Sequence, residues 1–233
     1  MDPFTLLVLL MMASSPIFGG ALVLSKWGDI MLALQGKKIA ILGATGTGKT
    51  TMYEFLTKKS LPEKHKQTLL ATTIKGGIFK FDERNIVLKK ATDVSGGEAS
   101  LAEWQKLFNE ADFVFYLIRT DELLNESELT VKRVNKDLEQ MATWNTNRSK
   151  NKLILQKKLI FLVGNHWTTD SRFEIAKKEQ KLMEYKDKFF DLLRLQINKL
   201  NVFKEVKVVV GCLGNKEDAR DLIMNILTEI CNK

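Results

Sequence analysis

Residues that build metal centres and disulfide frameworks are scarce in this sequence. Its 233 residues include only two cysteines, two histidines and three prolines. Cys212 and Cys231 form no metal-ligand spacing, which argues against a structural zinc site. Free thiols also fit a cytosolic domain. Because prolines are few and 27% of the residues are charged, the composition argues against long disordered segments.

Positive charge is in moderate excess. The chain carries 36 lysines and arginines against 28 aspartates and glutamates, a formal net charge of +8. An excess of this size is compatible with an anionic membrane, with nucleic acid or with no specific partner. Because no nucleic-acid-binding motif accompanies it, we predict no nucleic-acid partner. One basic stretch is interpreted either as a lipid-facing patch or as a solvated loop: Arg148, Lys150, Lys152, Lys157 and Lys158.

The N-terminal segment contains a charge-free run. Residues 4–24 are long and apolar enough to span a bilayer core as a helix. Three interpretations compete: a transmembrane anchor, a cleaved signal peptide, and a hairpin or interfacial segment broken at Pro16. Asp2 in place of a basic start weighs against the signal peptide. By the positive-inside tendency, basic residues after the run place the remaining chain in the cytoplasm: Lys26, Lys37 and Lys38.

Two regions follow from this division. We expect residues 1–35 to form a single-pass N-terminal membrane anchor with a linker, and residues 36–233 to form one globular domain. Apolar residues in the linker recur at helical spacing, and that face either docks on the domain or lies on the membrane: Trp27, Ile30, Met31 and Leu34.

A glycine-rich motif stands near the start of the domain. The segment Gly43-Ala44-Thr45-Gly46-Thr47-Gly48-Lys49-Thr50 matches the phosphate-loop pattern G-x-x-x-x-G-K-S/T. A buried strand is predicted before it and a helix after it, which is the context that the motif needs. We therefore expect backbone N–H groups to cradle phosphates, Lys49 to reach the β- and γ-phosphates, and the Thr50 hydroxyl to bind Mg²⁺. The alternative is a glycine- and threonine-rich turn without a ligand.

Strand-length apolar runs alternate with helical periodicity through the rest of the domain. Two neighbouring strand patterns, 76–82 and 86–92, predict a hairpin. Strands alternating with helices predict a mostly parallel sheet covered on both faces. The remaining predicted segments are strands over 112–118, 159–163 and 206–210 and helices over 99–110, 127–144, 171–200 and 218–230.

Ligands of such sheets bind at the carboxyl ends of the strands, so the residues there are candidates. Asp93 follows the second hairpin strand and is positioned to hold Mg²⁺ through water, and the N–H of Gly96 to meet a γ-phosphate. Asn165 follows the strand over 159–163, and Gly211-Cys212-Leu213-Gly214 follows the last strand. Thr73 lies in the polar loop before the hairpin.

This pattern resembles the Ras-like superfamily of P-loop GTPases over nearly all of residues 36–233. Thr73-Ile74 looks like the switch I threonine, and Asp93-Val94-Ser95-Gly96 looks like the switch II D-x-x-G. With the N-terminal membrane element, the chain is most similar to the Arf group and the beta subunit of the signal-recognition-particle receptor. The resemblance implies an α/β, three-layer P-loop NTPase fold: a mostly parallel six-stranded sheet with one antiparallel edge strand, preceded by an N-terminal membrane helix. It also implies GTP/GDP and Mg²⁺ as cofactors.

The sequence departs from the family pattern at two sites. The family glutamine that orients the attacking water is replaced by Gly97, so intrinsic hydrolysis is expected to be slow or to need a partner. Glu98 either substitutes for that glutamine or caps a helix. The family's base-recognition motif N-K-x-D is altered as well. Asn165-His166-Trp167-Thr168 lacks its lysine and aspartate, and Asp170 comes two residues late. Asp170 either contacts guanine or caps the following helix.

Three hypotheses result. The first is a membrane-anchored GTPase switch that is read by a protein effector and assisted by a GTPase-activating partner. The second is a membrane-bound receptor or assembly subunit that holds GTP without significant turnover, and the third is an ATP-using P-loop enzyme. Lys49 and Thr73 are predicted to be catalytic, and Thr50, Thr73 and Asp93 to bind the metal. The predicted nucleotide contacts are Gly43, Ala44, Thr45, Gly46, Thr47, Gly48, Lys49, Thr50, Thr51, Gly96, Asn165, His166, Asp170, Cys212 and Leu213.

Overall fold

One twisted sheet organises the part of the chain that the structure, a computed structural model, describes: residues 37–58, 77–81, 84–90, 98–150, 158–199 and 205–231. Its strands lie in the order β2-β3-β1-β4-β5-β6. β2 and β3 pair antiparallel, and all other neighbours pair parallel. The bounds are β1 (Lys38–Gly43), β2 (Gly77–Phe81), β3 (Arg84–Lys90), β4 (Phe113–Arg119), β5 (Leu159–Asn165) and β6 (Glu205–Val210).

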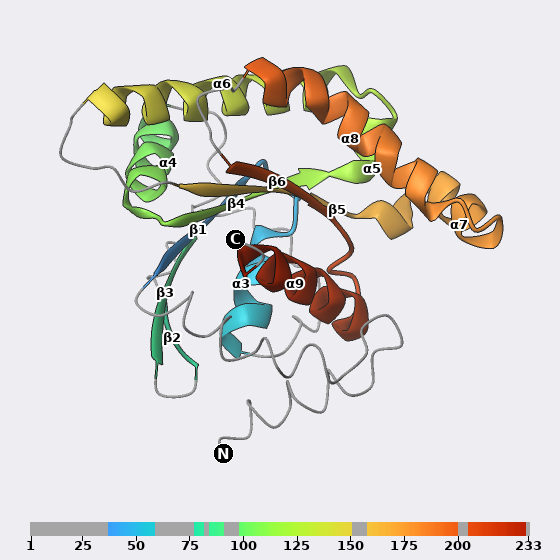
Figure 1. Ribbon diagram of the computed structural model, residues 1–233, viewed down its shortest axis with the longest axis horizontal. Helices are drawn as coiled ribbons and strands as arrows, with labels where there is room; N and C mark the ends of the chain where they lie inside the picture. The colour runs from blue at the N-terminus through green and yellow to red at the C-terminus, as the bar shows by residue number, and fades with distance from the viewer. Residues whose placement is uncertain are drawn as a thin grey trace.

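Helices cover both faces of this sheet. In Figure 1, α3 and α9 lie on one face, and α4, α6 and α8 lie on the other. The bounds are α3 (Lys49–Lys58), α4 (Glu98–Glu110), α5 (Thr120–Leu124), α6 (Glu128–Lys150), the 3-10 helix η1 (Trp167–Thr169), α7 (Ser171–Lys178), α8 (Leu182–Lys199) and α9 (Lys216–Cys231). The expected α/β fold around a mostly parallel sheet is therefore confirmed, and so is the hairpin.

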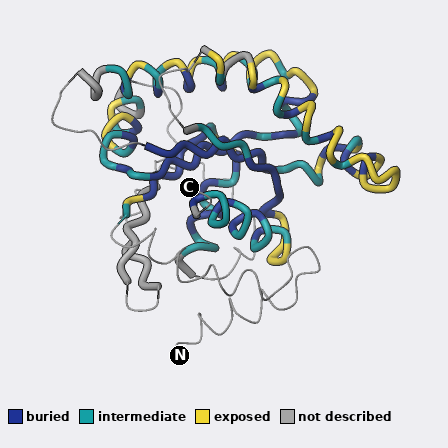
Figure 2. Tube along the Cα trace, viewed as in Figure 1, coloured by how far each residue is buried: buried dark blue, intermediate teal, exposed yellow. Residues whose placement is uncertain are grey.

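Two apolar cores explain the layers. On β4, Phe113, Phe115 and Leu117 join the core beneath α3 and α9, while Val114 and Tyr116 join the core beneath α4, α6 and α8. The alternation follows from the period of two in a strand. Figure 2 shows the result as a buried sheet between helices whose exposed residues face outward. The central strands are apolar on both faces because both faces are covered.

The single helix predicted over 171–200 is wrong. The chain forms α7 and α8, separated at Glu179-Gln180-Lys181. Gln180 has φ +59, a left-handed conformation that ends a helix. The N–H of Lys181 donates to the Ala176 carbonyl at 2.7 Å and closes the turn. Residues 177–181, Lys-Lys-Glu-Gln-Lys, contain no apolar residue, and this gap in the helical period was the available signal for the break.

Lys158 is not part of a solvated or lipid-facing patch. Its side chain is buried, with the ammonium donating to the Phe108 and Ala111 carbonyls at the end of α4. The Nζ atom also lies 4.3 Å from the centre of the Phe108 ring, within the range of a cation–π contact. This lysine therefore attaches the start of β5 to the end of α4.

The predicted anchor and linker, residues 1–35, lie outside the described residues. From residue 37 onward, the described helices include none that is long and apolar enough to cross a membrane.

We expect Lys158→Met to lower the free energy of unfolding by about 2–4 kcal/mol, because two buried carbonyls lose a charged donor. Chemical denaturation measures this. Lys132→Ala is the control: it removes an exposed ion pair with Glu128 on α6 and should cost less than about 0.5 kcal/mol. Equal losses in the two variants would contradict the anchoring role of Lys158.

Candidate functional site

The glycine-rich loop turns sharply between β1 and α3. Gly48 has φ +96, and a Cβ atom on it would lie 2.4 Å from Nδ2 of Asn165. A side chain at this position is therefore excluded both by backbone conformation and by space. The first helical bond of α3 runs from the Met52 N–H to the Gly48 carbonyl at 2.9 Å. The N–H groups before it belong to the first turn, where helix geometry directs donors out of the N-terminus.

Lys49 folds back over this loop. Its side chain is 2% exposed. The ammonium donates to the Gly43 carbonyl at 2.7 Å and to the Ala44 carbonyl at 2.6 Å. The Thr47 hydroxyl donates to the same Ala44 carbonyl at 2.9 Å. The loop thus holds a positive charge at the N-terminus of a helix, an arrangement that attracts anions.

Asn165, the last residue of β5, connects three segments at the carboxyl edge of the sheet. Its amide nitrogen donates to the Thr47 carbonyl at 2.9 Å, and its amide oxygen accepts from the Leu213 N–H at 2.9 Å. The residue is 1% exposed. The glycine-rich loop, the end of β5 and the turn after β6 are therefore held together by one buried amide.

The residues after Asn165 pack against the same loop. His166 adopts φ +64, a left-handed conformation in which histidine is enriched, and its Nε2 atom lies 3.1 Å from the Gly46 carbonyl. Two residues on, the Thr168 hydroxyl lies 3.0 Å from the Cys212 sulfur. The Gly214 N–H donates to that sulfur at 3.2 Å. The turns after β5 and β6 thus meet beside the glycine-rich loop.

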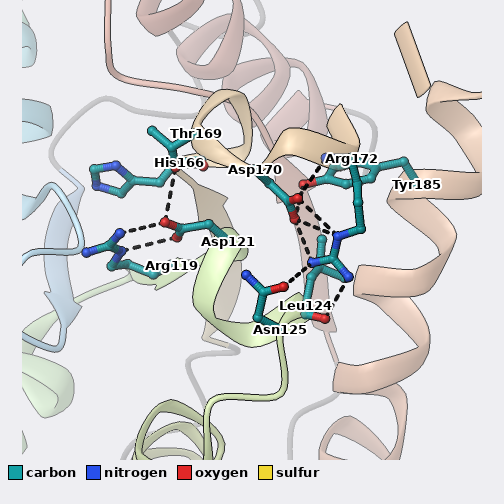
Figure 3. A network of polar contacts seen from close by, with 9 residues as sticks. All are labelled: Arg119, Asp121, Leu124, Asn125, His166, Thr169, Asp170, Arg172 and Tyr185. Carbon is teal, nitrogen blue, oxygen red and sulfur yellow. Dashed lines mark hydrogen bonds and ion pairs between the residues drawn. The ribbon is translucent and has the colours of Figure 1, made fainter. Parts of the chain in front are cut away.

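Asp170 is turned away from this cluster and caps α7. Its carboxylate accepts from the Arg172 N–H at 2.9 Å, from the Arg172 guanidinium at 2.7 Å, and from the Tyr185 hydroxyl at 3.2 Å. Figure 3 shows Arg172 and Tyr185 beside the carboxylate. Of the two roles considered for Asp170, the structure shows the helix cap, and its carboxylate makes no contact with the glycine-rich loop.

The pKa of Asp170 reflects these partners. Burial alone would raise the pKa of the carboxyl group. Hydrogen bonds and charge from Arg172, with a further bond from Tyr185, outweigh burial and hold the pKa below its ordinary value. Burial raises the pKa of Tyr185, and the charge and hydrogen bond of Asp170 raise it further. Asp170 is therefore ionised in the fold.

A second carboxylate near this turn is missed by the sequence reasoning. Asp121, just after β4, forms a two-point contact with the Arg119 guanidinium at 3.1 and 2.5 Å and accepts from the Thr169 hydroxyl at 3.1 Å. The Thr169 hydroxyl also lies 2.6 Å from the His166 carbonyl. Figure 3 shows the contact between Asp121 and Thr169, which links α5 to the turn after β5. The position of Asp121 at the carboxyl end of a parallel strand was the available signal.

The structure brings most of the predicted site together. Residues 43–51 form one loop and first helical turn, and Asn165, His166, Cys212 and Leu213 lie beside it. Thr73, Asp93 and Gly96 lie outside the described residues, as does Gly97. Within the described ranges, no group of three or more histidine, cysteine, aspartate or glutamate side chains is arranged to hold a metal ion. Comparison of the sequence with protein-family models and with curated proteins finds no match.

We expect Asp170→Asn to lower the free energy of unfolding by about 1–2 kcal/mol at pH 7. Because the folded pKa is held down, this contribution is complete above the ordinary value of about 3.9 and is lost as the pH falls through the folded pKa. The difference from the parent protein should therefore shrink at acidic pH.

Denaturant titration at several pH values measures this. Asp187→Asn, at an exposed position on α8, is the control and should change the free energy of unfolding by less than about 0.5 kcal/mol. A constant difference between Asp170→Asn and the parent from neutral to acidic pH would contradict the ionised cap.

Proposed function

We propose that this protein binds a nucleoside triphosphate together with Mg²⁺ and works as a membrane-anchored, nucleotide-dependent switch or assembly subunit with slow or partner-dependent hydrolysis. GTP is the triphosphate that the family resemblance suggests. The observation that carries the proposal is the loop over residues 43–50, with buried Lys49 folded across it at the start of α3.

The shape of the loop fits a chain of phosphates. Gly46 has φ +78, and a Cβ atom built on it would meet no other atom within 4 Å. The loop is therefore open at the position where its backbone is bare, and Lys49 supplies positive charge close by. Backbone donors, a helix N-terminus and a lysine are the groups by which proteins hold di- and triphosphates.

The position of the loop in the sheet supports the same proposal. β1 stands between β3 and β4, and the chain adds strands first on one side of β1 and then on the other. Ligands of open α/β sheets bind where the strand order reverses in this way, outside the carboxyl ends. The loop directly follows β1 at this point. The arrangement is compatible with the P-loop NTPase fold that the resemblance implies.

The metal and the chemistry belong to the same proposal. Thr50, the second residue of α3, would bind Mg²⁺ together with Thr73 and Asp93, and the bound ion would supply neutralising charge to the phosphates. Gly97 offers no side chain to orient water, so hydrolysis is proposed to be slow, on the order of 10⁻³ s⁻¹ or below without a partner.

We expect Lys49→Ala to weaken triphosphate binding by about a hundredfold or more, because the loop loses its charge. Equilibrium binding of a fluorescently labelled triphosphate with Mg²⁺ measures this, and phosphate release measures turnover. Lys132→Ala, on an exposed face of α6, is the matched control and should bind like the parent protein. Parent-like binding by Lys49→Ala would overturn the site assignment.

Turnover separates the candidate functions. Phosphate release that a second protein accelerates supports the switch. Intact GTP that stays bound through purification favours the assembly subunit, the second candidate, and the missing glutamine at Gly97 is the feature in its favour. A transferred phosphoryl group on an acceptor other than water supports an ATP-using enzyme instead.

The anchor is tested separately. We expect the full chain to float with lipid vesicles in a density gradient and to resist extraction by alkaline carbonate, because residues 4–24 form an uncharged run of membrane-spanning length. A chain lacking residues 1–35 should remain with the soluble fraction. Vesicle binding that is unchanged by this deletion would contradict the anchor.

A further inference from the structure

The neighbours of the glycine-rich loop indicate which side chains would contact the base of a bound nucleotide. This inference rests on the proposed triphosphate binding. On the β5 and β6 side, the loop is contacted by Asn165, through the Thr47 carbonyl, and by His166, through the Gly46 carbonyl. The next polar contact outward joins the Thr168 hydroxyl to the Cys212 sulfur. A nucleoside extending from the loop toward this side meets these two turns.

Selection of guanine over adenine has a clear chemical requirement. Guanine presents two adjacent N–H donors on its pairing edge, whereas adenine presents an acceptor at the equivalent ring nitrogen. An ionised carboxylate accepts two parallel hydrogen bonds, and it repels the adenine acceptor. A protein that lacks a carboxylate facing the base therefore loses most of the basis for rejecting adenine.

Both aspartates in the turns after β4 and β5 are already engaged. Asp170 is 4% exposed and accepts hydrogen bonds from Arg172 and Tyr185. Asp121 is held by Arg119 and Thr169. Figure 3 shows each carboxylate directed at its own partners. Turning either one toward a base would break a two-point ion pair with an arginine, and Arg119 would keep only Glu122 as a partner.

Arg172 makes this arrangement still harder to change. Its guanidinium also donates to the Leu124 carbonyl at 2.9 Å and to the Asn125 side-chain oxygen at 3.1 Å. It therefore joins the end of α5 to the start of α7 while it holds Asp170. Reorientation of the Asp170 carboxylate would disturb three elements at once.

The polar group left beside the loop in the turn after β5 is the hydroxyl of Thr168. Thr168 is half-buried and lies 3.0 Å from Cys212. A hydroxyl is both a hydrogen-bond donor and an acceptor, so it can pair with the adenine edge or the guanine edge. We propose that the site accepts purine nucleoside triphosphates without selecting guanine over adenine, because the Thr168 hydroxyl beside Cys212 faces the base while Asp121 and Asp170, in the described turns after β4 and β5, are held by their arginines.

The test is a competition experiment on the full chain in detergent. A ribose-labelled fluorescent GTP with Mg²⁺ is displaced by unlabelled GTP, ATP or inorganic tripolyphosphate. We expect the dissociation constants of GTP and ATP to agree within about tenfold. A preference for either purine above about a hundredfold overturns the inference.

Two variants sharpen the result. Thr168→Asp places a carboxylate at the base and should raise the ratio of GTP to ATP affinity by about thirtyfold, the effect of one good two-point contact. Thr168→Val removes only the hydroxyl and should weaken both nucleotides equally. A Thr168→Asp protein that binds nucleotide with an unchanged ratio contradicts the base-facing position of Thr168.

Asp170→Asn tests the alternative that Asp170 contacts the base. We expect its GTP to ATP ratio to equal that of the parent, because Asp170 faces α7 and α8. A tenfold or greater loss of GTP affinity alone would show that Asp170 reads the base. If tripolyphosphate competes while one purine is strongly preferred, the base inference fails and the phosphate site stands. If no probe binds, the proposed function itself fails.

Discussion

The buried amide of Asn165 is the contact on which the whole carboxyl edge of the sheet depends. It satisfies a carbonyl in the glycine-rich loop and an N–H in the turn after β6, across 118 and 48 residues of chain. Each of those backbone groups would otherwise be buried without this partner, which is costly. The close approach also requires glycine at position 48, where a Cβ atom would collide with the amide. The Asn165 side chain and the glycine at position 48 therefore determine the shape of the loop together.

The sheet places this contact at the edge where the turns after its parallel strands meet. Parallel pairing of β1, β4, β5 and β6 aligns their carboxyl ends, so every turn that follows them opens at one edge. Apolar side chains on both faces of the central strands keep that alignment rigid. Lys158 adds a polar link at the opposite end of β5, where it joins the strand to α4. The strand order thus adds to the hydrogen bonds that Lys49 and Thr47 make within the loop.

Much of this arrangement could be predicted from local patterns. Apolar runs indicated the strands, and the glycine-rich motif indicated a strand–turn–helix unit that the structure contains at 38–58. Sequence patterns did not predict the features that depend on tertiary contacts. Gln180 lies in a short polar stretch between α7 and α8, and the prediction of one helix ran across it. Lys158 is typical of a surface charge until its carbonyl partners are known. Asp170 fitted two roles in the sequence, and only the positions of Arg172 and Tyr185 identify the cap.

The two halves of the proposed nucleotide site differ in how readily a sequence can alter them. Phosphate binding relies on backbone N–H groups, a helix terminus and one lysine, so it needs glycines and a fold more than a particular set of side chains. Base discrimination relies on a single carboxylate in one turn. In this chain the turn after β5 keeps Asn165, which supports the loop, while its neighbouring carboxylates are committed to Arg172 and Arg119. The support of the glycine-rich loop by Asn165 therefore does not depend on any carboxylate in these turns.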